Sequence, residues 1–396
     1  MKINITVVLL ILGAYFLSTG ISYAAFSALS AKDSGLKSPA ADKSKITPVS
    51  KASKFKLDPQ IPKEEVCPLN GALYTKKEKD LWETRRPLVV MIENHQDARP
   101  QSGLSLSDVV YEAVAEGGIT RFAAVYYCTA AAFDVQIGPV RSARTYFLDF
   151  ASEYGDKPLY AHIGGANTDG PADALSQIED YGWAGINDLN QFSIGYPVFW
   201  RDYERLGREV NTEHTMYSTT NKLWQYAADK RLLTNVDKKG KEWDTAFVSW
   251  KFKDETAKEK RPETQTIGLN FWSGYNDYAV RWIYDKNTNV YMRENGGQPH
   301  IDLDTDEQLY SKTVIIQFMT EKNADDGYEN NAHMLYGTKG SGRTLIFQDG
   351  TVTEGKWQKT KRTDRTIFVD SKGKEVSFNR GRLWVEILPI GATVSY

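Results

Sequence analysis

The sequence has few of the residues from which metal and cofactor sites are usually built. Only 2 of its 396 residues are cysteine and 5 are histidine. None of them stands at CxxC, HxxxH or HExxH spacing. No Walker loop, GxSxG or GxGxxG motif occurs in a strand–turn–helix context. We therefore expect no metal site and no bound cofactor.

A large excess of charge of one sign is also absent. The formal net charge is −2, which provides no broad basic surface for binding phosphate backbones, so no nucleic-acid partner is expected. The hydrophobic content of 41% is ordinary and excludes a polytopic membrane protein. A chain of 396 residues is long enough for two or three domains, each with its own core.

Long apolar runs are missing except in residues 1–31. After Lys2 this segment has no charged side chain, and Val7–Leu17 is almost wholly apolar. That length is typical of a signal peptide, and the small residues up to Ala24 suit cleavage there. The segment is also long enough to cross a bilayer as an uncleaved anchor helix. Both interpretations stay open, and both predict an exported, extracytoplasmic protein that is either membrane-anchored or secreted.

A linker over residues 32–85 is expected to follow. Its first part, Lys32–Lys63, is rich in Lys, Ser, Ala and Pro and has no apolar periodicity. Cys67 and Cys128 are an even pair in an exported chain, which favours a disulfide bond. The alternative is two separate buried thiols, because sequence spacing does not place their Cα atoms within bridging distance.

Residues 86–235 show the alternation of strands and helices that is typical of an α/β domain. Short apolar runs predict strands at Leu88–Ile92, Phe122–Tyr127 and Leu159–Ile163. Periodicity and capping residues predict helices at Ser105–Glu116, Ser142–Tyr154, a segment opened by Pro171, and Thr220–Lys230. This order indicates a largely parallel sheet with flanking helices, and ligands bind such sheets beyond the carboxyl ends of the strands.

Charged side chains gather near those predicted strand ends. On a helix over Ser105–Glu116, the carboxylates of Asp108, Glu112 and Glu116 would share one face. Arg141 and Arg144 stand at the start of the next helix, where free N–H groups favour anions. Three interpretations stay open: a structural Arg–carboxylate network, a pocket for a phosphate or carboxylate, and a catalytic site with a carboxylate as acid or base.

The candidate residues follow from these positions. The catalytic candidates are Asp108, Glu112, Glu116 and His162. The ligand-binding candidates are Asn94, His95, Arg99, Arg121, Arg141, Arg144 and His300.

Residues 241–396 predict a β-rich domain, a small barrel or a sandwich. Short strands bounded by Gly and Asp turns are expected at Ala279–Tyr284, Val290–Arg293, Thr313–Met319, Thr344–Phe347, Thr366–Val369 and Leu383–Leu388. Four tryptophans accompany them: Trp272, Trp282, Trp357 and Trp384. They are expected either to fill the core or to stack on sugar rings.

An ordered set of motifs resembles the YerB-like family of bacterial lipoproteins, which is built on a domain of unknown function. The motifs are RPQSGL from Arg99, DVVYE from Asp108, EGGITRF from Glu116, IGPVRSAR from Ile137, HIGG from His162, GQPHID from Gly297 and GKW from Gly355. The resemblance implies an extracytoplasmic, envelope-associated protein with an N-terminal α/β domain and a C-terminal β-rich domain, and no defined activity. A lipid anchor at the leader is not expected, because the first cysteine is Cys67.

A looser similarity concerns the LytR-CpsA-Psr phosphotransferases, which hold a polyprenyl pyrophosphate with arginines. Arg121 opens a strand and Arg141 follows a Pro-containing loop as in those enzymes, but their aspartate beside the first arginine is missing here. The leading expectation is a protein that binds an anionic or glycan ligand from the cell wall in an Arg/carboxylate cleft. The alternatives are a wall-active glycan hydrolase or phosphotransferase, and a scaffold whose aromatic β-rich domain docks another envelope protein.

Overall fold

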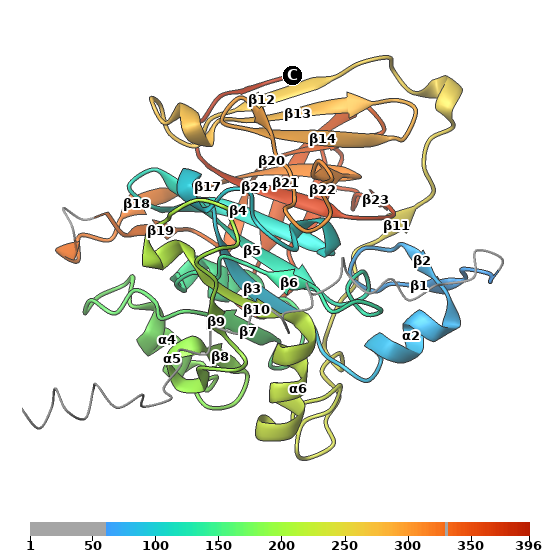
Figure 1. The fold of residues 1–396 in the computed structure, drawn as a ribbon. Coiled ribbons are helices and arrows are strands. Elements are labelled where there is room, and N and C mark those ends of the chain that lie inside the picture. The colour runs from blue at the N-terminus through green and yellow to red at the C-terminus, as the bar shows by residue number, and fades with distance from the viewer. Residues whose placement is uncertain (1–60, 329–331) are drawn as a thin grey trace, which may run out of the picture. The chain divides into compact units, whose positions relative to one another are not determined.

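The fold is organised around one large mixed β-sheet. The computed structural model describes residues 61–328 and 332–396, and Figure 1 shows their arrangement. Within this part of the chain the sheet has ten strands in the order β22-β21-β20-β17-β24-β4-β5-β3-β7-β8. The strands from the first half are β3 (Leu88–Glu93), β4 (Val109–Glu116), β5 (Ile119–Tyr126), β7 (Leu159–His162) and β8 (Asp188–Asn190). Those from the second half are β17 (Thr313–Met319), β20 (Gly340–Gln348), β21 (Thr351–Lys359), β22 (Ile367–Asp370) and β24 (Leu383–Pro389).

The two halves of the chain are joined within this sheet. Strand β24 pairs in parallel with β4, and the pairs run from Leu383 opposite Val109 to Glu386 opposite Glu112. Each apolar run predicted as a strand is a strand in the structure. The regions expected as separate domains therefore share one continuous hydrogen-bonded sheet.

The expectation of a largely parallel sheet is wrong. Strand pairs β3–β7, β7–β8, β24–β4 and β17–β24 are parallel, whereas β3–β5, β4–β5, β17–β20, β20–β21 and β21–β22 are antiparallel. Two antiparallel neighbouring strands can be connected by a short turn, whereas two parallel neighbouring strands need a longer crossover connection.

The predicted helix over Ser105–Glu116 is also wrong, because most of this segment is strand β4. Every residue of β4 except the last is buried, so both faces of the strand are in the core. In such a strand apolar residues occur at every position, and their helical spacing does not distinguish a helix from a strand. Gly117 and Gly118 have φ values of 56° and 79°. Two consecutive positive φ values build a tight hairpin turn to β5, where the sequence pattern predicted a helix end.

The described residues contain five α-helices: α2 (Lys76–Trp82), α3 (Thr145–Ala151), α4 (Ala174–Asp180), α5 (Gln191–Ile194) and α6 (Thr220–Arg231). The helices predicted near Ser142, Pro171 and Thr220 correspond to α3, α4 and α6. Helix α2 begins with a capping box in which Thr75 and Glu78 satisfy each other's backbone N–H groups.

Part of the predicted linker is folded. Two short strands, β1 (Glu65–Val66) and β2 (Leu73–Tyr74), pair with each other ahead of α2. Cys67 is joined by a disulfide bond to Cys128, just after β5. The ordered structure therefore begins well before residue 86, and the disulfide fastens it to the large sheet.

A second sheet packs face to face on the strands of the second half (Figure 1). Its strands are β12 (Thr266–Leu269), β13 (Val280–Asp285), β14 (Val290–Asn295), β15 (Gln298–Pro299), β16 (Tyr310–Ser311) and β25 (Val394–Ser395). Trp282 lies between the two sheets, where its ring meets Trp384 at 5.3 Å and its Nε1 donates to Glu386. Trp282, Trp357 and Trp384 are all buried, so these three tryptophans fill the core.

The remaining short elements connect these layers. They are β6 (Gln136–Ile137), β9 (Trp200–Arg201), β10 (Met216–Thr219), β11 (Phe252–Lys253), β18 (Glu321–Asn323), β19 (Met334–Tyr336), β23 (Phe378–Asn379) and the 3₁₀ helices η1 (Gln96–Ala98), η2 (Leu104–Leu106), η3 (Thr212–His214), η4 (Lys258–Lys260) and η5 (Asn276–Tyr278). Among the described residues no helix has the length and apolar character needed to cross a membrane. The predicted signal peptide or anchor, residues 1–31, lies outside them.

Candidate functional site

The carboxyl ends of β3, β4 and β7 meet at one edge of the large sheet. The loop over residues 137–144 crosses this edge, because Arg141 donates its N–H to Met91 at the end of β3 and accepts from Ile163 after β7. Five charged side chains meet here, and we call them the polar edge: Glu93, Glu116, Arg121, Arg141 and Arg144. Each of the three arginines contacts a carboxylate here.

Glu116 holds two of the arginines in ion pairs. Its Oε1 accepts from Arg121 Nη2 at 2.9 Å and its Oε2 from Arg144 Nε at 3.0 Å. The guanidinium-bearing side chains of Arg121 and Arg144 are only 3% and 6% exposed. Burial alone would raise the pKa of Glu116, but the two arginines hold it well below its usual range. Arg121 and Arg144 are therefore committed to a structural network.

Arg141 is placed differently from the other two arginines. Its Nε lies 3.1 Å from Glu93 Oε1, while 26% of its side chain is exposed. Among the described residues no hydrogen bond occupies its terminal nitrogens, and its side chain is more exposed than those of Arg121 and Arg144. Arg141 is therefore the arginine of the polar edge that can contact a ligand.

Two predicted carboxylates lie far from this edge. Asp108 precedes β4, roughly 26 Å from Glu116 along the strand, and accepts the N–H groups of Tyr127, Cys128 and Thr129. Glu112 is fully buried in the middle of β4. Residues four positions apart are separated by about 13 Å along a strand but only about 6 Å along a helix, so β4 spreads the three carboxylates out. The predicted single cleft is therefore not formed by these residues.

Two other candidates, Asn94 and Arg99, have their polar groups occupied by internal hydrogen bonds. Asn94 donates to Glu112 and Thr120 and accepts from Arg99 Nε. Arg99 also donates to the carbonyls of Asn94 and Asp277. These contacts hold the loop after β3 against η5, so Asn94 and Arg99 have structural roles.

Two predicted histidines are buried with both ring nitrogens occupied. His162 ends β7 as expected, and its Nε2 and Nδ1 each lie 2.6 Å from an oxygen, of Asp188 and Gly164 respectively. His300 contacts Gln101 and Arg293. Burial, followed by the charges of Arg293 and Arg99, lowers the pKa of His300 well below its usual value. Neither ring has a nitrogen left for a ligand.

His95 has an unpredicted partner, His214, at the end of η3. Their rings stack at a centroid distance of 4.8 Å with an interplanar angle of 13°. His214 Nδ1 lies 3.0 Å from Glu93 Oε2, and this hydrogen bond raises the pKa of His214. No local pattern signals this pair, because the two histidines are far apart in the sequence.

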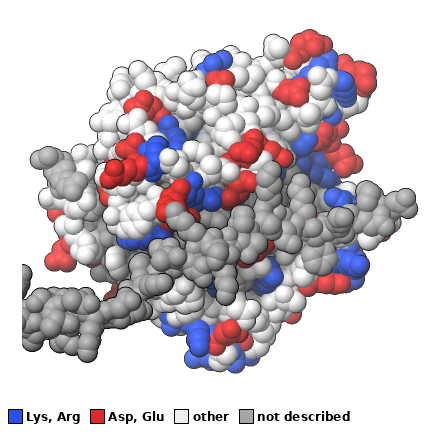
Figure 2. All heavy atoms as spheres, in the orientation of Figure 1, with Lys and Arg blue, Asp and Glu red and all other residues white. Residues whose placement is uncertain are grey.

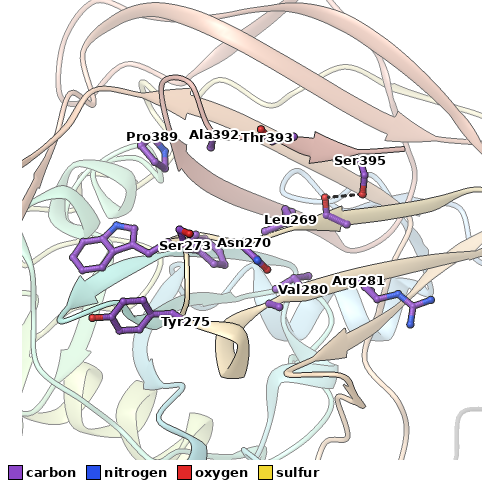
Figure 3. Close-up of a pocket in the computed structure, with 14 residues that line it drawn as sticks. Leu269, Asn270, Ser273, Tyr275, Val280, Arg281, Pro389, Ala392, Thr393 and Ser395 are labelled. Atoms are coloured by element: carbon purple, nitrogen blue, oxygen red, sulfur yellow. Dashed lines mark hydrogen bonds between the residues drawn. The ribbon is translucent and has the colours of Figure 1, made fainter.

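A groove of about 950 Å³ lies beside the second sheet (Figure 3). We call it the aromatic groove; its side chains include Asn270, Phe271, Trp272, Ser273, Tyr275, Arg281, Thr393 and Ser395. Figure 3 shows Tyr275 at one end and Arg281 at the other, with Asn270 between them. Trp272 is only partly buried and its Nε1 donates to Glu321 Oε1 at 2.8 Å. It is thus the one of the four tryptophans named above that borders a groove.

The groove also adjoins the β4–β5 turn. Tyr275 packs on Gly118 so closely that a Cβ there would lie 2.3 Å from the tyrosine ring. A side chain at position 118 would displace Tyr275, so this turn needs glycine for two reasons, its positive φ and the ring above it.

Acidic and basic side chains are interspersed on the face of the molecule that Figure 2 presents. No patch of a single sign dominates that face. This distribution agrees with the small net charge of the sequence.

Comparisons with known proteins place this chain in a family. Residues 71–234 match the "Protein of unknown function (DUF3048) N-terminal domain" and residues 267–385 match the corresponding C-terminal domain. "Putative lipoprotein YerB" of Bacillus subtilis (strain 168) is 28% identical over 340 residues, which cover 84% of this chain and 88% of that protein. The crystal structure of the YerB protein from Bacillus subtilis is similar, with a TM-score of 0.65 and 25% identity over 84% of this chain and 100% of that one. The resemblance expected from the motifs is confirmed, and the chain belongs to the YerB-like family of DUF3048 proteins.

Proposed function

We propose that this protein is exported to the cell envelope and binds a glycan there in the aromatic groove. The relative from Bacillus subtilis is named a lipoprotein, which supports an exported and membrane-anchored protein. The Cys67–Cys128 disulfide supports the same location, because disulfides persist in oxidising compartments outside the cytoplasm.

The observation that carries the proposal is the pair of aromatic rings at the groove. Trp272 and Tyr275 meet edge to face at 5.5 Å, and Tyr275 is 41% exposed. Asn270, Ser273 and Thr393 stand beside them. Sugar rings have apolar C–H faces and polar hydroxyl edges, so they fit a surface where aromatic rings lie next to hydrogen-bonding groups.

Arg281 makes the groove suitable for an acidic glycan. Its side chain is 54% exposed at the groove and its Nη1 lies 2.9 Å from Glu294. Because more than half of the Arg281 side chain is exposed, a ligand carboxylate can reach its guanidinium group. We therefore keep the expectation of an anionic ligand, but we propose the aromatic groove, and not the polar edge, as its binding site.

Binding without hydrolysis fits this groove best. Glycoside hydrolases use two carboxylates on either side of the scissile bond. Among the described residues that line the groove none is Asp or Glu. The catalytic candidates Asp108 and Glu112 are both fully buried, so neither reaches a sugar.

The test is calorimetric titration of the folded protein with lysozyme-digested peptidoglycan and with tetra-N-acetylglucosamine. Tyr275→Ala is expected to weaken binding about tenfold, as for an aromatic residue that carries much of an interface. Tyr203→Ala is the matched control, because Tyr203 is 52% exposed and lies outside the groove. Equal affinities of the two variants and the unmodified protein would contradict the proposal, as would the absence of binding to both probes.

A further inference from the structure

The structure brings together two histidines and an aspartate at the end of β3. His95 is the N-cap of η1, Asp97 lies within η1, and His214 is the last residue of η3. The loop over residues 137–144 fixes their approach, because Val140 donates to Met216 of β10 and Arg141 donates to Met91 of β3. We propose that His95, Asp97 and His214 bind a divalent transition-metal ion, with Zn²⁺ as the representative.

The spacing of the three side chains suits one ion. One ligand atom from each residue lies within 4.8 Å of the others. His95 Nδ1 and Asp97 Oδ2 are 3.7 Å apart. Metal–ligand bonds of about 2.0–2.1 Å at tetrahedral angles separate ligand atoms by about 3.3 Å. In this structure the His95 ring stacks on the His214 ring, and its Nδ1 accepts the Asp97 N–H. An ion bound by both rings lies in the plane of each, so the partly exposed His95 ring has to turn out of the stack, together with a rotation of Asp97, to bring the donors into coordination distance.

Glu93 orients the second histidine for this role. Its Oε2 lies 3.0 Å from His214 Nδ1, so that nitrogen donates to the carboxylate and Nε2 keeps its lone pair for a metal. A carboxylate behind a histidine ligand fixes the tautomer and the ring orientation and makes the ring more basic. The other oxygen of Glu93 contacts Arg141, 3.1 Å away, which holds the carboxylate in place.

The donor set leaves room for a further ligand. Two imidazoles and one carboxylate occupy three positions of a zinc or iron site and leave at least one open. His214 is 4% exposed, whereas His95 and Asp97 are 27% and 50% exposed. The open position therefore faces solvent from the side of Asp97, where a water or an external ligand can reach it.

Arg208 competes with the ion for Asp97. Its Nη1 lies 3.8 Å from Asp97 Oδ1, and its Nη2 donates to the Asp97 carbonyl at 2.7 Å. The Arg208 side chain is 44% exposed, so it can swing into solvent when the ion binds. Removing its charge is therefore expected to strengthen metal binding, an effect that a purely structural histidine pair does not predict.

The experiment titrates the metal-free, full-length folded protein with ZnCl₂ by calorimetry and with CoCl₂ by visible absorption. We expect one ion per chain and the intense visible bands of low-symmetry Co²⁺. His95→Gln and His214→Gln should each weaken binding at least tenfold, Glu93→Gln about tenfold, and Arg208→Gln should strengthen it.

Glu213→Gln is the control, since it removes a neighbouring exposed charge and no proposed ligand. His95 is partly exposed, so its variant remains informative if the His214 variant does not fold. Binding that is equally tight in the His95 variant and the unmodified protein would overturn the proposal. The absence of Zn²⁺ binding by the unmodified protein would do so as well.

Discussion

Glu112 of β4 and Arg293 of β14 form an ion pair in which both side chains are completely buried. The two residues come from opposite halves of the chain, and the pair fastens the second sheet to the large one. Thr120 and Asn94 donate two further hydrogen bonds to Glu112. A buried ion pair is stable while both partners and their hydrogen bonds are present. Removing one partner leaves the remaining charge buried without compensation, which carries a large desolvation penalty.

Glu112→Gln is therefore expected to destabilise the protein by about 3–5 kcal/mol, because it leaves Arg293 without its counter-charge. Glu386 lies beside this pair. Burial and then the charge of Glu112 raise its pKa well above the usual value, which favours its neutral form. Glu386→Gln should then change stability by less than about 1 kcal/mol. Urea unfolding of both variants measures the difference, and similar losses in the two would contradict this assignment.

The ion pairs of Glu116 predict a specific dependence of stability on pH. Its pKa in the folded protein lies well below the usual glutamate value because of the two arginines, so the ionised form stabilises the fold. This contribution is complete above the unfolded-state pKa and is lost as the pH falls from there toward the folded-state pKa. Glu116→Gln should lower the free energy of unfolding at about pH 7. Between about pH 5 and pH 3 this free energy should fall less in the variant than in the unmodified protein. Parallel curves of unfolding free energy against pH for the two proteins would show that Glu116 has no such role.

The disulfide is expected to contribute strongly to stability. Cys67 and Cys128 are separated by 61 positions, and a loop of this length corresponds to about 4 kcal/mol of reduced unfolded-state entropy at 25 °C. The double variant Cys67→Ala/Cys128→Ala should unfold at a clearly lower urea concentration. The unmodified protein unfolded in reducing buffer should match it. Unchanged midpoints in both would mean that the bond adds nothing to stability.

Asp108 should behave as a structural anchor beside that disulfide. It accepts three backbone N–H groups and, in addition, donors from Asn70 and Thr129. Asp108→Asn places an NH₂ group against these donors and should cost about 2–4 kcal/mol, since buried donors lose their acceptor. Asp169→Asn, at an exposed position, is the control and should have no measurable effect. Thermal unfolding distinguishes the two, and equal midpoints would refute the anchoring role.

Apolar runs bounded by turn residues were reliable guides to the strands. Leu88–Ile92 and Thr313–Met319 are buried on both faces and have strand length, and both are strands. The run at Val109–Glu116 has the same character, but its apolar residues also fit a helical face, and the glycine pair after it fits either a helix end or a hairpin. The secondary structure of such a segment is decided by the strands that pair with it, here β5 and β24 on its two sides.

The candidate site was likewise only partly predictable from local patterns. Local residue types pointed to arginines and a carboxylate near strand ends, because helix starts and strand ends follow from short-range patterns. They could not show that Glu116 pairs with both Arg121 and Arg144 while Arg141 pairs with Glu93 and stays partly exposed. They also could not show that His95 meets His214, since ring stacking depends on two chain segments that are close only in space.

Short-range patterns in the chain thus established the apolar strands, the β-rich second half and the resemblance to the YerB-like family. Long-range packing established the mixed order of the ten strands, the joining of the two halves through β4 and β24, and the partner of every buried charge. The reason is physical. Apolar periodicity is set by neighbours along the chain, whereas a buried charge is stable only beside the particular partner that the completed fold brings to it.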